Sequence, residues 1–176
     1  MKKESDNNEE ELVGVFKEER PKLLRYACYR LGNETDAEDM LQETFLKIHT
    51  RLQALDRTEI QDLRSYLFRT LTNICTKWQN SNSHIKTVPL DIEVDITDLP
   101  TKTQNDEDYQ RIMQLLTNIP EEQADVIRLR IYADKSFAEI AQILSLPLPT
   151  VKSRFLYGLE KIRKGIKQER VKKLKG

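Results

Sequence analysis

The stretch that decides the fold runs from Ser136 to Gly158 and reads SFAEIAQILSLPLPTVKSRFLYG. Ser136 and Glu139 form an S-x-x-E capping box, which satisfies two backbone donors at the start of a helix. Apolar residues then recur at the spacing of one helical face: Phe137, Ile140, Ala141 and Leu144. Pro147 ends this helix, because proline lacks a backbone donor and disfavours helix in the residue before it. Pro149 fits the first turn of a second helix, so the stretch predicts a helix-turn-helix.

The second helix of this motif has two distinct faces. Its apolar face is Val151, Phe155, Leu159, Ile162 and Ile166. The opposite face is Thr150, Ser153, Arg154, Tyr157 and Lys161. Hydroxyls and an arginine near the start of such a helix suit base edges and phosphates in a major groove. A solvated helix hairpin would show the same pattern, so the pattern alone leaves both interpretations open.

The length of this 176-residue chain allows one domain or two small ones, and its composition favours an all-helical protein. It has only five glycines and six prolines, and 33% of its residues are charged. Cys28 and Cys75 lie far apart without a C-x-x-C motif, which predicts free core thiols in a reducing cytoplasm. No apolar run approaches the roughly 20 residues of a membrane span, and the polar N-terminus does not resemble a signal peptide. We therefore expect a soluble, cytoplasmic protein.

The formal net charge of zero hides an uneven distribution. Residues 111–176 carry 14 Lys or Arg against 7 Asp or Glu, whereas residues 81–110 carry 2 against 7. A basic C-terminal third is expected of a module that binds phosphates. Basic tails also occur on proteins that bind nothing, so the charge supports DNA binding without proving it.

Residues 10–80 are predicted to form a helical domain after a frayed polar start. Four helices are expected there: Glu10–Glu19, Pro21–Leu31, Thr35–Leu52 and Ile60–Asn80. Gly32 would close the second as a left-handed cap, and Thr35 and Glu38 would form a capping box for the third. Opposite its buried stripe, the third helix has a polar face that includes Asp39, Gln42 and Glu43. Leu46 lies on the same face and is its one large apolar residue. An exposed leucine can dock a partner, although a single one usually has no function.

The fourth helix is predicted to bury one side and to leave the other in solvent. The expected inner side is Leu63, Tyr66, Leu67, Thr70, Ile74 and Trp78. The expected outer or lateral residues are Ser65, Arg69, Thr72, Asn73, Thr76 and Gln79. Such a face could contact bases, but it is more often only solvated.

Residues 81–108 are predicted to be a flexible acidic linker, because they show no helical stripe and little hydrophobicity. A second domain over residues 109–170 would then contain the helix-turn-helix. Its first helix would carry Ile112 to Ile119. Pro120 would open the next helix, with Glu121 and Glu122 near its positive N-terminus.

No catalytic or metal-binding motif stands out, so we expect no enzyme, no metal and no cofactor. The sequence lacks a G-x-S-x-G motif, a P-loop and a glycine-rich dinucleotide turn. The two histidines, His49 and His84, are isolated from each other and from the cysteines.

Motifs in a fixed order resemble one protein family. The first two are D-A-E-D-M-L-Q-E-T-F-L-K (Asp36 to Lys47) and L-R-S-Y-L-F-R-T-L-T-N (Leu63 to Asn73). I-P-E-E-Q (Ile119 to Gln123) follows, and then F-A-E-I-A-Q-I-L and P-L-P-T-V-K-S-R between Phe137 and Arg154. Together they look like the extracytoplasmic-function (ECF) group of bacterial sigma factors, in the sigma-70 family. The resemblance spans nearly the whole chain, from Leu12 to Ile166.

The resemblance implies a promoter-specificity subunit whose partners are core RNA polymerase, through its clamp coiled coil and flap, and promoter DNA. An anti-sigma factor is a further partner that it allows, and the linker would run toward the RNA exit path. The implied clamp-docking residues are Asp39, Gln42, Glu43 and Leu46. The implied −10 residues are Arg69 and Asn73, with Trp78 available for stacking. The implied −35 residues are Thr150, Lys152, Ser153, Arg154, Tyr157 and Lys161.

The chain departs from the family pattern at positions that bear on DNA contacts, among them Thr72, Lys77, Pro149 and Tyr157. Gly158 also replaces a small helix former, at a cost of about 1 kcal/mol in helix propensity. The promoter sequence is therefore not implied. Two alternatives stay open: a stand-alone helix-turn-helix regulator, which would leave the polar face around Leu46 unused, and a helical adaptor whose basic helix binds an acidic partner.

Overall fold

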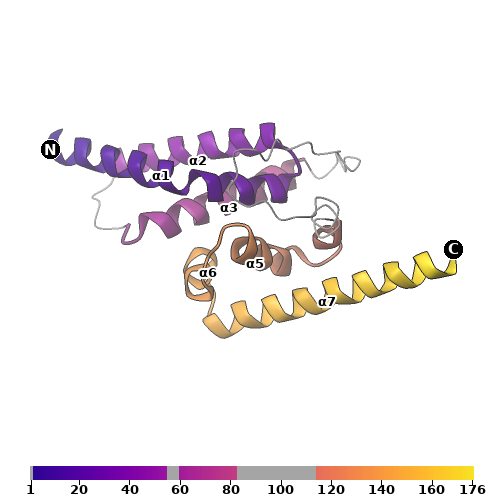
Figure 1. Cartoon of the computed structure of the whole chain (residues 1–176). Coiled ribbons are helices and arrows are strands. Elements are labelled where there is room, and N and C mark those ends of the chain that lie inside the picture. The colour runs from indigo at the N-terminus through magenta and orange to yellow at the C-terminus, as the bar shows by residue number, and fades with distance from the viewer. Residues whose placement is uncertain (1, 55–59, 83–113) are drawn as a thin grey trace. The chain divides into compact units, whose positions relative to one another are not determined.

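The computed structural model describes residues 2–54, 60–82 and 114–176, with side chains from residue 6 onward. The chain divides into two compact units, Met1–Ile96 and Thr97–Gly176. Both consist of helices in the described ranges, where no strand occurs (Figure 1). The predicted all-α fold with two small helical domains is confirmed. The predicted linker beyond residue 82 and the predicted domain start at Tyr109 lie outside the described residues.

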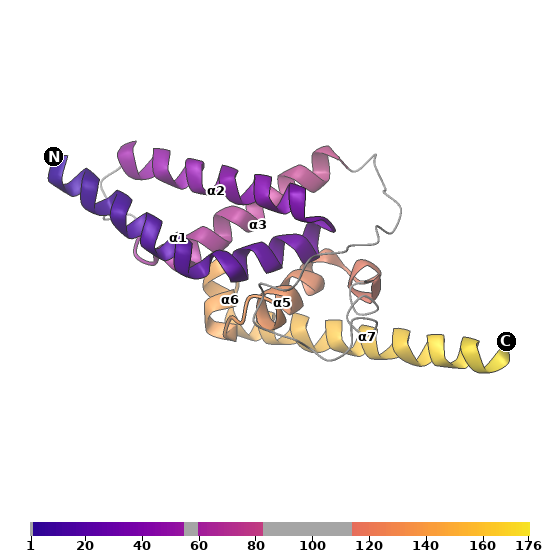
Figure 2. The same ribbon diagram turned by 45° about the horizontal axis from the view of Figure 1, so that its top comes forward.

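The N-terminal unit is a bundle of three helices, α1 (Lys2–Leu31), α2 (Glu34–Ala54) and α3 (Leu63–Ser81). Each of the three packs against the other two (Figure 2). Its largest fully buried side chains are Leu12, Leu23, Tyr26, Leu41, Ile48, Leu67, Phe68 and Leu71. Burial of these apolar surfaces is the main force that holds the bundle together.

Helix α1 is continuous, so the prediction of two helices and a frayed start was wrong. Pro21 lies inside it. A proline in a helix interior removes one hydrogen bond and costs about 3 kcal/mol in helix stability. Leu12 and Leu23, on either side of Pro21, are both fully buried. Packing on both sides of the proline therefore outweighs its local preference and keeps the two segments in one helix.

The α1–α2 corner is built by Gly32 and Asn33. Gly32 has φ +86°, and its N–H donates to the Cys28 carbonyl at 2.8 Å, as predicted for a left-handed cap. Asn33 Oδ1 then accepts from the Asp36 N–H at 2.7 Å. Because Asn33 caps the start of α2, the predicted capping box of Thr35 with Glu38 was wrong. Glu38 instead pairs with Arg20 of α1 at 2.5 Å.

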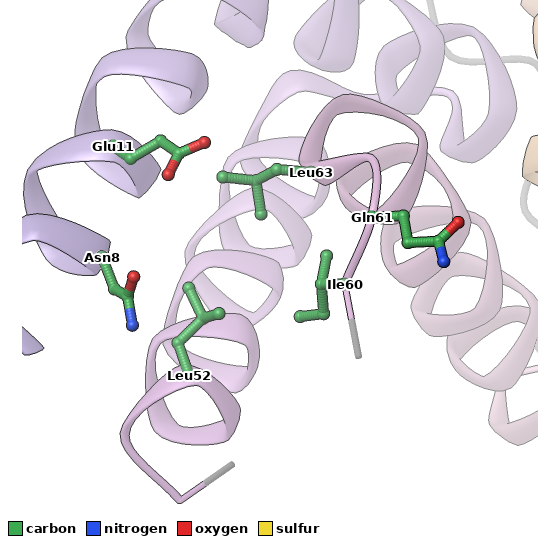
Figure 3. A pocket seen from close by; sticks show the side chains of 6 residues that line it. All are labelled: Asn8, Glu11, Leu52, Ile60, Gln61 and Leu63. Carbon is green, nitrogen blue, oxygen red and sulfur yellow. The ribbon is translucent and has the colours of Figure 1, made fainter. Parts of the chain in front are cut away.

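Helix α3 begins after Asp62, whose carboxylate accepts from the N–H groups of Arg64 (3.1 Å) and Ser65 (3.3 Å). Leu52, Ile60 and Leu63 point toward one another beside α1 and surround a small hollow (Figure 3). The hollow measures ≈ 60 Å³, whereas sites for small organic ligands measure about 300–1,000 Å³. It is therefore a packing defect rather than a substrate site.

The C-terminal unit contains a helical turn over residues 114–117 and the helices α5 (Glu121–Ile131), α6 (Phe137–Leu144) and α7 (Leu148–Lys175). The predicted helix-turn-helix is confirmed in α6 and α7. Ser136 Oγ accepts from the Glu139 N–H at 3.1 Å, and Glu139 Oε2 accepts from the Ser136 N–H at 2.7 Å. Ser145 takes the left-handed conformation (φ +53°) that ends α6.

Two glycines let α7 approach its neighbours closely. A Cβ atom at Gly158 would lie 2.6 Å from Ile127 Cδ1 of α5, and one at Gly165 would lie 2.7 Å from Leu115 Cδ2. Residues seven apart share a helical face, so one side of α7 packs on α5 and on the 114–117 turn. The propensity cost of Gly158 thus has a tertiary reason that the sequence does not show.

Candidate functional site

The polar face of α2 is open to solvent and contains one large apolar side chain. Asp39, Gln42, Glu43 and Leu46 are all exposed, and Leu46 is 62% exposed. Their spacing of three and four residues places them on one side of the helix. The residues buried on the other side are Ala37, Met40, Leu41, Thr44 and Ile48. The structure therefore brings all four predicted residues together as one surface, which we call the α2 face.

The polar side of α3 contains only two of the three residues that the sequence predicts to contact the −10 element. Asn73 is exposed and Arg69 is half-buried one turn before it. Trp78 is also half-buried, but it follows Arg69 by nine residues, which is about 180° around the helix. The structure therefore groups Arg69 with Asn73 and separates Trp78 from them.

Two residues predicted to face outward on α3 are buried. Ser65 and Thr72 are 8% and 6% exposed. Ser65 Oγ donates to Asp62 at 2.6 Å, so it belongs to the helix cap. Thr72 lies against α1, and its carbonyl accepts from Arg30. The simple inner–outer division of α3 was wrong at these positions because α1 and α2 cover α3 from two directions.

Arg30, in the last turn of α1, joins α1 to the second half of α3. It is 6% exposed. Its guanidinium donates to the Thr72 carbonyl (3.2 Å), to Thr76 Oγ1 (2.6 Å) and to Gln79 Oε1 (3.1 Å). It also donates to the Tyr26 hydroxyl at 2.6 Å, and Gln79 Nε2 donates back to the Arg30 carbonyl at 3.2 Å. No sequence motif identifies Arg30 as a residue that joins two helices. The one signal was an arginine four residues after a tyrosine in an apolar stripe.

Arg64 joins the first turn of α3 to the middle of α1. Its two terminal nitrogens pair with Glu18 and with Glu19, each at 2.6 Å. The hydrogen bonds to Glu18 and Glu19 raise the pKa of Arg64 above its ordinary value. Glu19 is buried, whereas Arg64 and Glu18 remain largely exposed. Helix α3 is thus attached to α1 by one arginine near each of its ends.

The outer side of α7 has the pattern expected of a recognition helix. Lys152, Ser153, Tyr157 and Lys161 are exposed, and Thr150 is half-buried. Lys152 follows Thr150 by two residues, about 200° around the helix, so it lies on another side from the remaining polar residues. The structure groups Thr150, Ser153, Arg154, Tyr157 and Lys161, and we call this group the α7 face.

Arg154 is held from α5. Its Nη2 atom lies 3.5 Å from Glu122 Oε2, and its side chain is 28% exposed. The sequence predicts only a favourable effect of Glu122 on the dipole at the start of α5, and not this ion pair. The ion pair means that Arg154 leans along the edge of α7 toward α5.

Contacts among an arginine of α5 and two phenylalanines join the two helices of the motif to α5. The Arg130 guanidinium lies 5.0 Å from the centre of the Phe137 ring, and Phe137 meets Phe155 edge to face at 5.1 Å. Arg130 also donates to the Lys135 carbonyl at 3.0 Å, in the loop before α6. These contacts set the angle at which α7 is presented, because they join α5, α6 and α7 at one point.

The buried titratable groups have a structural role. Burial, and to a lesser degree Glu34 and Glu38, raises the pKa of the Cys28 thiol to about 12. Cys28 and Cys75 are both buried thiols that are not joined in a disulfide, as predicted. Burial also raises the pKa of Tyr132 to about 12, against an opposing effect of Arg128. Groups that keep their protons in this way offer no nucleophile at neutral pH.

The described ranges contain no group of three or more His, Cys, Asp or Glu side chains that could hold a metal ion. In the same ranges, no helix combines the length and the apolar character that crossing a bilayer would require.

Two family models match this chain. Sigma-70 region 2 matches residues 15–84, and Sigma-70, region 4 matches residues 115–164. The chain is 27% identical over 172 residues to the ECF RNA polymerase sigma factor SigW of Bacillus subtilis, covering 89% of this chain and 88% of that protein. It is 28% identical over 154 residues to the ECF RNA polymerase sigma factor SigL of Mycobacterium tuberculosis, covering 85% of each.

A solved structure has the same fold. It is the sigma factor RpoE in complex with the anti-sigma factor NepR from Bartonella quintana, with a TM-score of 0.64 and 19% sequence identity. The match covers 92% of this chain and 97% of that one.

Proposed function

The chain belongs to the extracytoplasmic-function group of the sigma-70 family, which directs promoter-specific transcription initiation by RNA polymerase, and we propose how its exposed faces divide this task. The α2 face binds the clamp coiled coil of core polymerase. The Arg69–Asn73 side of α3 captures the −10 element, and the α7 face recognises the −35 element. The chain acts by binding alone, in the cytoplasm beside core polymerase. We include an anti-sigma factor among its partners, because the structural neighbour was solved with one.

One observation carries the clamp assignment. Leu46 is 62% exposed on a helix whose opposite side is buried, and exposed acids and an amide surround it. Protein interfaces commonly bury an apolar centre inside a polar rim that excludes water, and the α2 face has this arrangement. A stand-alone DNA-binding regulator would have no use for this surface.

Run-off transcription on a library of genomic fragments tests the function as a whole. We expect discrete transcripts only when core polymerase and this chain are both present. The chain should also co-purify with core polymerase in the absence of DNA. Binding of a specific DNA site by the chain alone, with no dependence of transcription on it in the presence of core, would contradict the proposal.

Asn73 is expected to act in strand opening, because its side chain is exposed and an amide can hydrogen-bond an unpaired base. Asn73→Ala should slow open-complex formation on duplex promoters. It should have less effect on a template that is already unpaired at the start site. Stopped-flow fluorescence on the two templates measures the difference, and an equal defect on both would exclude a role in opening.

Arg154 is expected to hold the DNA backbone rather than to recognise a base. Its ion pair with Glu122 supports this role, because it holds the guanidinium beside α5. Arg154→Ala should weaken binding to all −35 variants alike and lower the slope of log affinity against log salt by about one unit. Thr150, Ser153 and Tyr157 are then the residues that contact bases.

A salt series on a panel of −35 variants measures this effect. Arg163→Ala is the matched control, because Arg163 is an exposed cation of α7 on a side away from Thr150. It should leave the salt slope nearly unchanged. Relaxed preference at a single base pair in the Arg154→Ala protein, with an unchanged slope, would show that Arg154 contacts that base.

A further inference from the structure

Arg30 touches the one stretch of α3 that carries Asn73. Its three contacts on α3 fall at residues 72, 76 and 79, which are two turns of the helix. We propose that Arg30 is a positioning residue for promoter opening, which holds the second half of α3 at the angle that presents Asn73 to unpaired DNA. This inference rests on the proposed role of α3.

The contact with the Thr72 carbonyl joins a side chain of α1 to the main chain of α3. Thr72 directly precedes Asn73, so this bond fixes the main chain from which the Asn73 side chain projects. The return bond from Gln79 Nε2 to the Arg30 carbonyl likewise engages the main chain of α1. Side-chain contacts alone would let α3 rotate or slide by a rotamer change, whereas bonds to carbonyl groups resist such movement.

The chemistry of the guanidinium suits this task. It is planar, always charged and carries five donors in a fixed fork, so one side chain can bind acceptors on two successive turns. Arg30 is nearly buried, and hydrogen bonds to a charged group are stronger where water is excluded. A lysine offers donors from a single point and cannot span Thr72, Thr76 and Gln79 together.

Helix α3 offers its own comparison. Arg64 attaches the first turn of α3 to α1 through Glu18 and Glu19. That attachment lies nine residues before Asn73 and ends on exposed Glu18 as well as on buried Glu19. It should contribute to the stability of the bundle without setting the position of Asn73.

The test compares open-complex formation on duplex and pre-unpaired promoters. The variants are Arg30→Lys, Thr76→Val, Gln79→Met and, as a conservative rescue, Thr76→Ser. Thr76→Val removes one hydrogen bond of Arg30, and Gln79→Met removes two. Thr76 is exposed and Gln79 half-buried, so we expect the bundle to stay folded in both variants. Circular dichroism and core binding verify folding of each variant before the rates are compared.

We expect opening of the duplex to slow by roughly threefold to tenfold when contacts of Arg30 are lost, which is the effect of losing one hydrogen bond of ordinary net strength. The rate on the pre-unpaired template should stay near that of the parent protein. Thr76→Ser should restore the parent rate because it keeps the hydroxyl. Arg64→Gln should lower the melting temperature without a defect specific to the duplex.

The outcomes separate this inference from the function on which it rests. If Asn73→Ala shows no duplex-specific defect, the role of α3 in opening fails. If Asn73→Ala shows the defect but folded Thr76→Val and Gln79→Met proteins open the duplex at the parent rate, the positioning role of Arg30 fails. An equal duplex-specific defect in Arg64→Gln would also overturn it, because general loosening of α3 would then explain the effect.

Discussion

Replacing Leu46 by lysine is expected to weaken binding to core RNA polymerase by about 30-fold or more, the usual cost of removing a central interface anchor. Leu46 is 62% exposed in the free chain, so it contributes little to the core of the N-terminal unit. Lysine has nearly the helix propensity of leucine, so α2 should keep its length. The substitution places a charge at the centre of the surface that the clamp would cover.

Titration of labelled core polymerase measures this loss, and thermal unfolding of the same proteins reports on folding. Gln42→Lys should act in the same direction, because Gln42 lies one turn from Leu46 on the α2 face. Lys47→Ala is the matched control, since Lys47 is exposed on α2 beside that face. If stability and core binding fell together in the Leu46→Lys protein, Leu46 would be a packing residue and the clamp assignment would fail.

Replacing Gly158 by leucine is expected to destabilise the C-terminal unit by about 1–3 kcal/mol, the typical cost of overpacking a closely packed site. A Cβ atom there would already lie 2.6 Å from Ile127 Cδ1 and 3.4 Å from Gln123 Cβ. The larger side chain must push α5 away from α7. Because α5 also holds Arg154 and the Phe137–Phe155 pair, binding to −35 DNA should fall with stability.

Gly158→Ala should be much milder, because the end of the Ile127 side chain can move and alanine gains about 1 kcal/mol of helix propensity. Gly14→Leu is the matched control, since nothing lies within 4 Å of a Cβ at that helical glycine. It should leave stability equal or higher. Calorimetry and −35 DNA binding of the full chain provide the measurements. A Gly158→Leu protein as stable as its parent would show that α5 and α7 are not packed this closely.

Local sequence patterns correctly predicted the helix ends that depend on residues only a few positions away in the sequence. The Ser136–Glu139 box, the Gly32 cap and the start of α5 after Pro120 all lie where the sequence places them. Each depends on hydrogen bonds or dihedral preferences within a few residues, so a short window contains the whole cause. The α2 face was predictable for a similar reason, because the spacing of its residues alone puts them opposite the buried stripe.

Other features needed the neighbours of each helix. Helix α1 continues through Pro21 because packing on both sides of the proline outweighs a local cost. Ser65 and Thr72 are buried because α3 is covered from two directions, which a single hydrophobic period does not describe. The separation of Trp78 from Arg69 is different, because their spacing alone already places them on opposite sides of the predicted helix.

The sequence by itself therefore determined the helix-turn-helix, the family and the helices other than the continuous α1, since these follow from periodicity, caps and ordered motifs. Only the tertiary structure decided which side chains join the helices: Arg30 on α3, Glu122 on Arg154, and Ile127 against Gly158. The physical reason is the range of the interactions. A cap or an apolar stripe is formed by residues a few positions apart. The contacts of Arg30, Arg154 and Gly158, in contrast, join residues that are at least 31 positions apart. Such pairs meet only after the helices have packed.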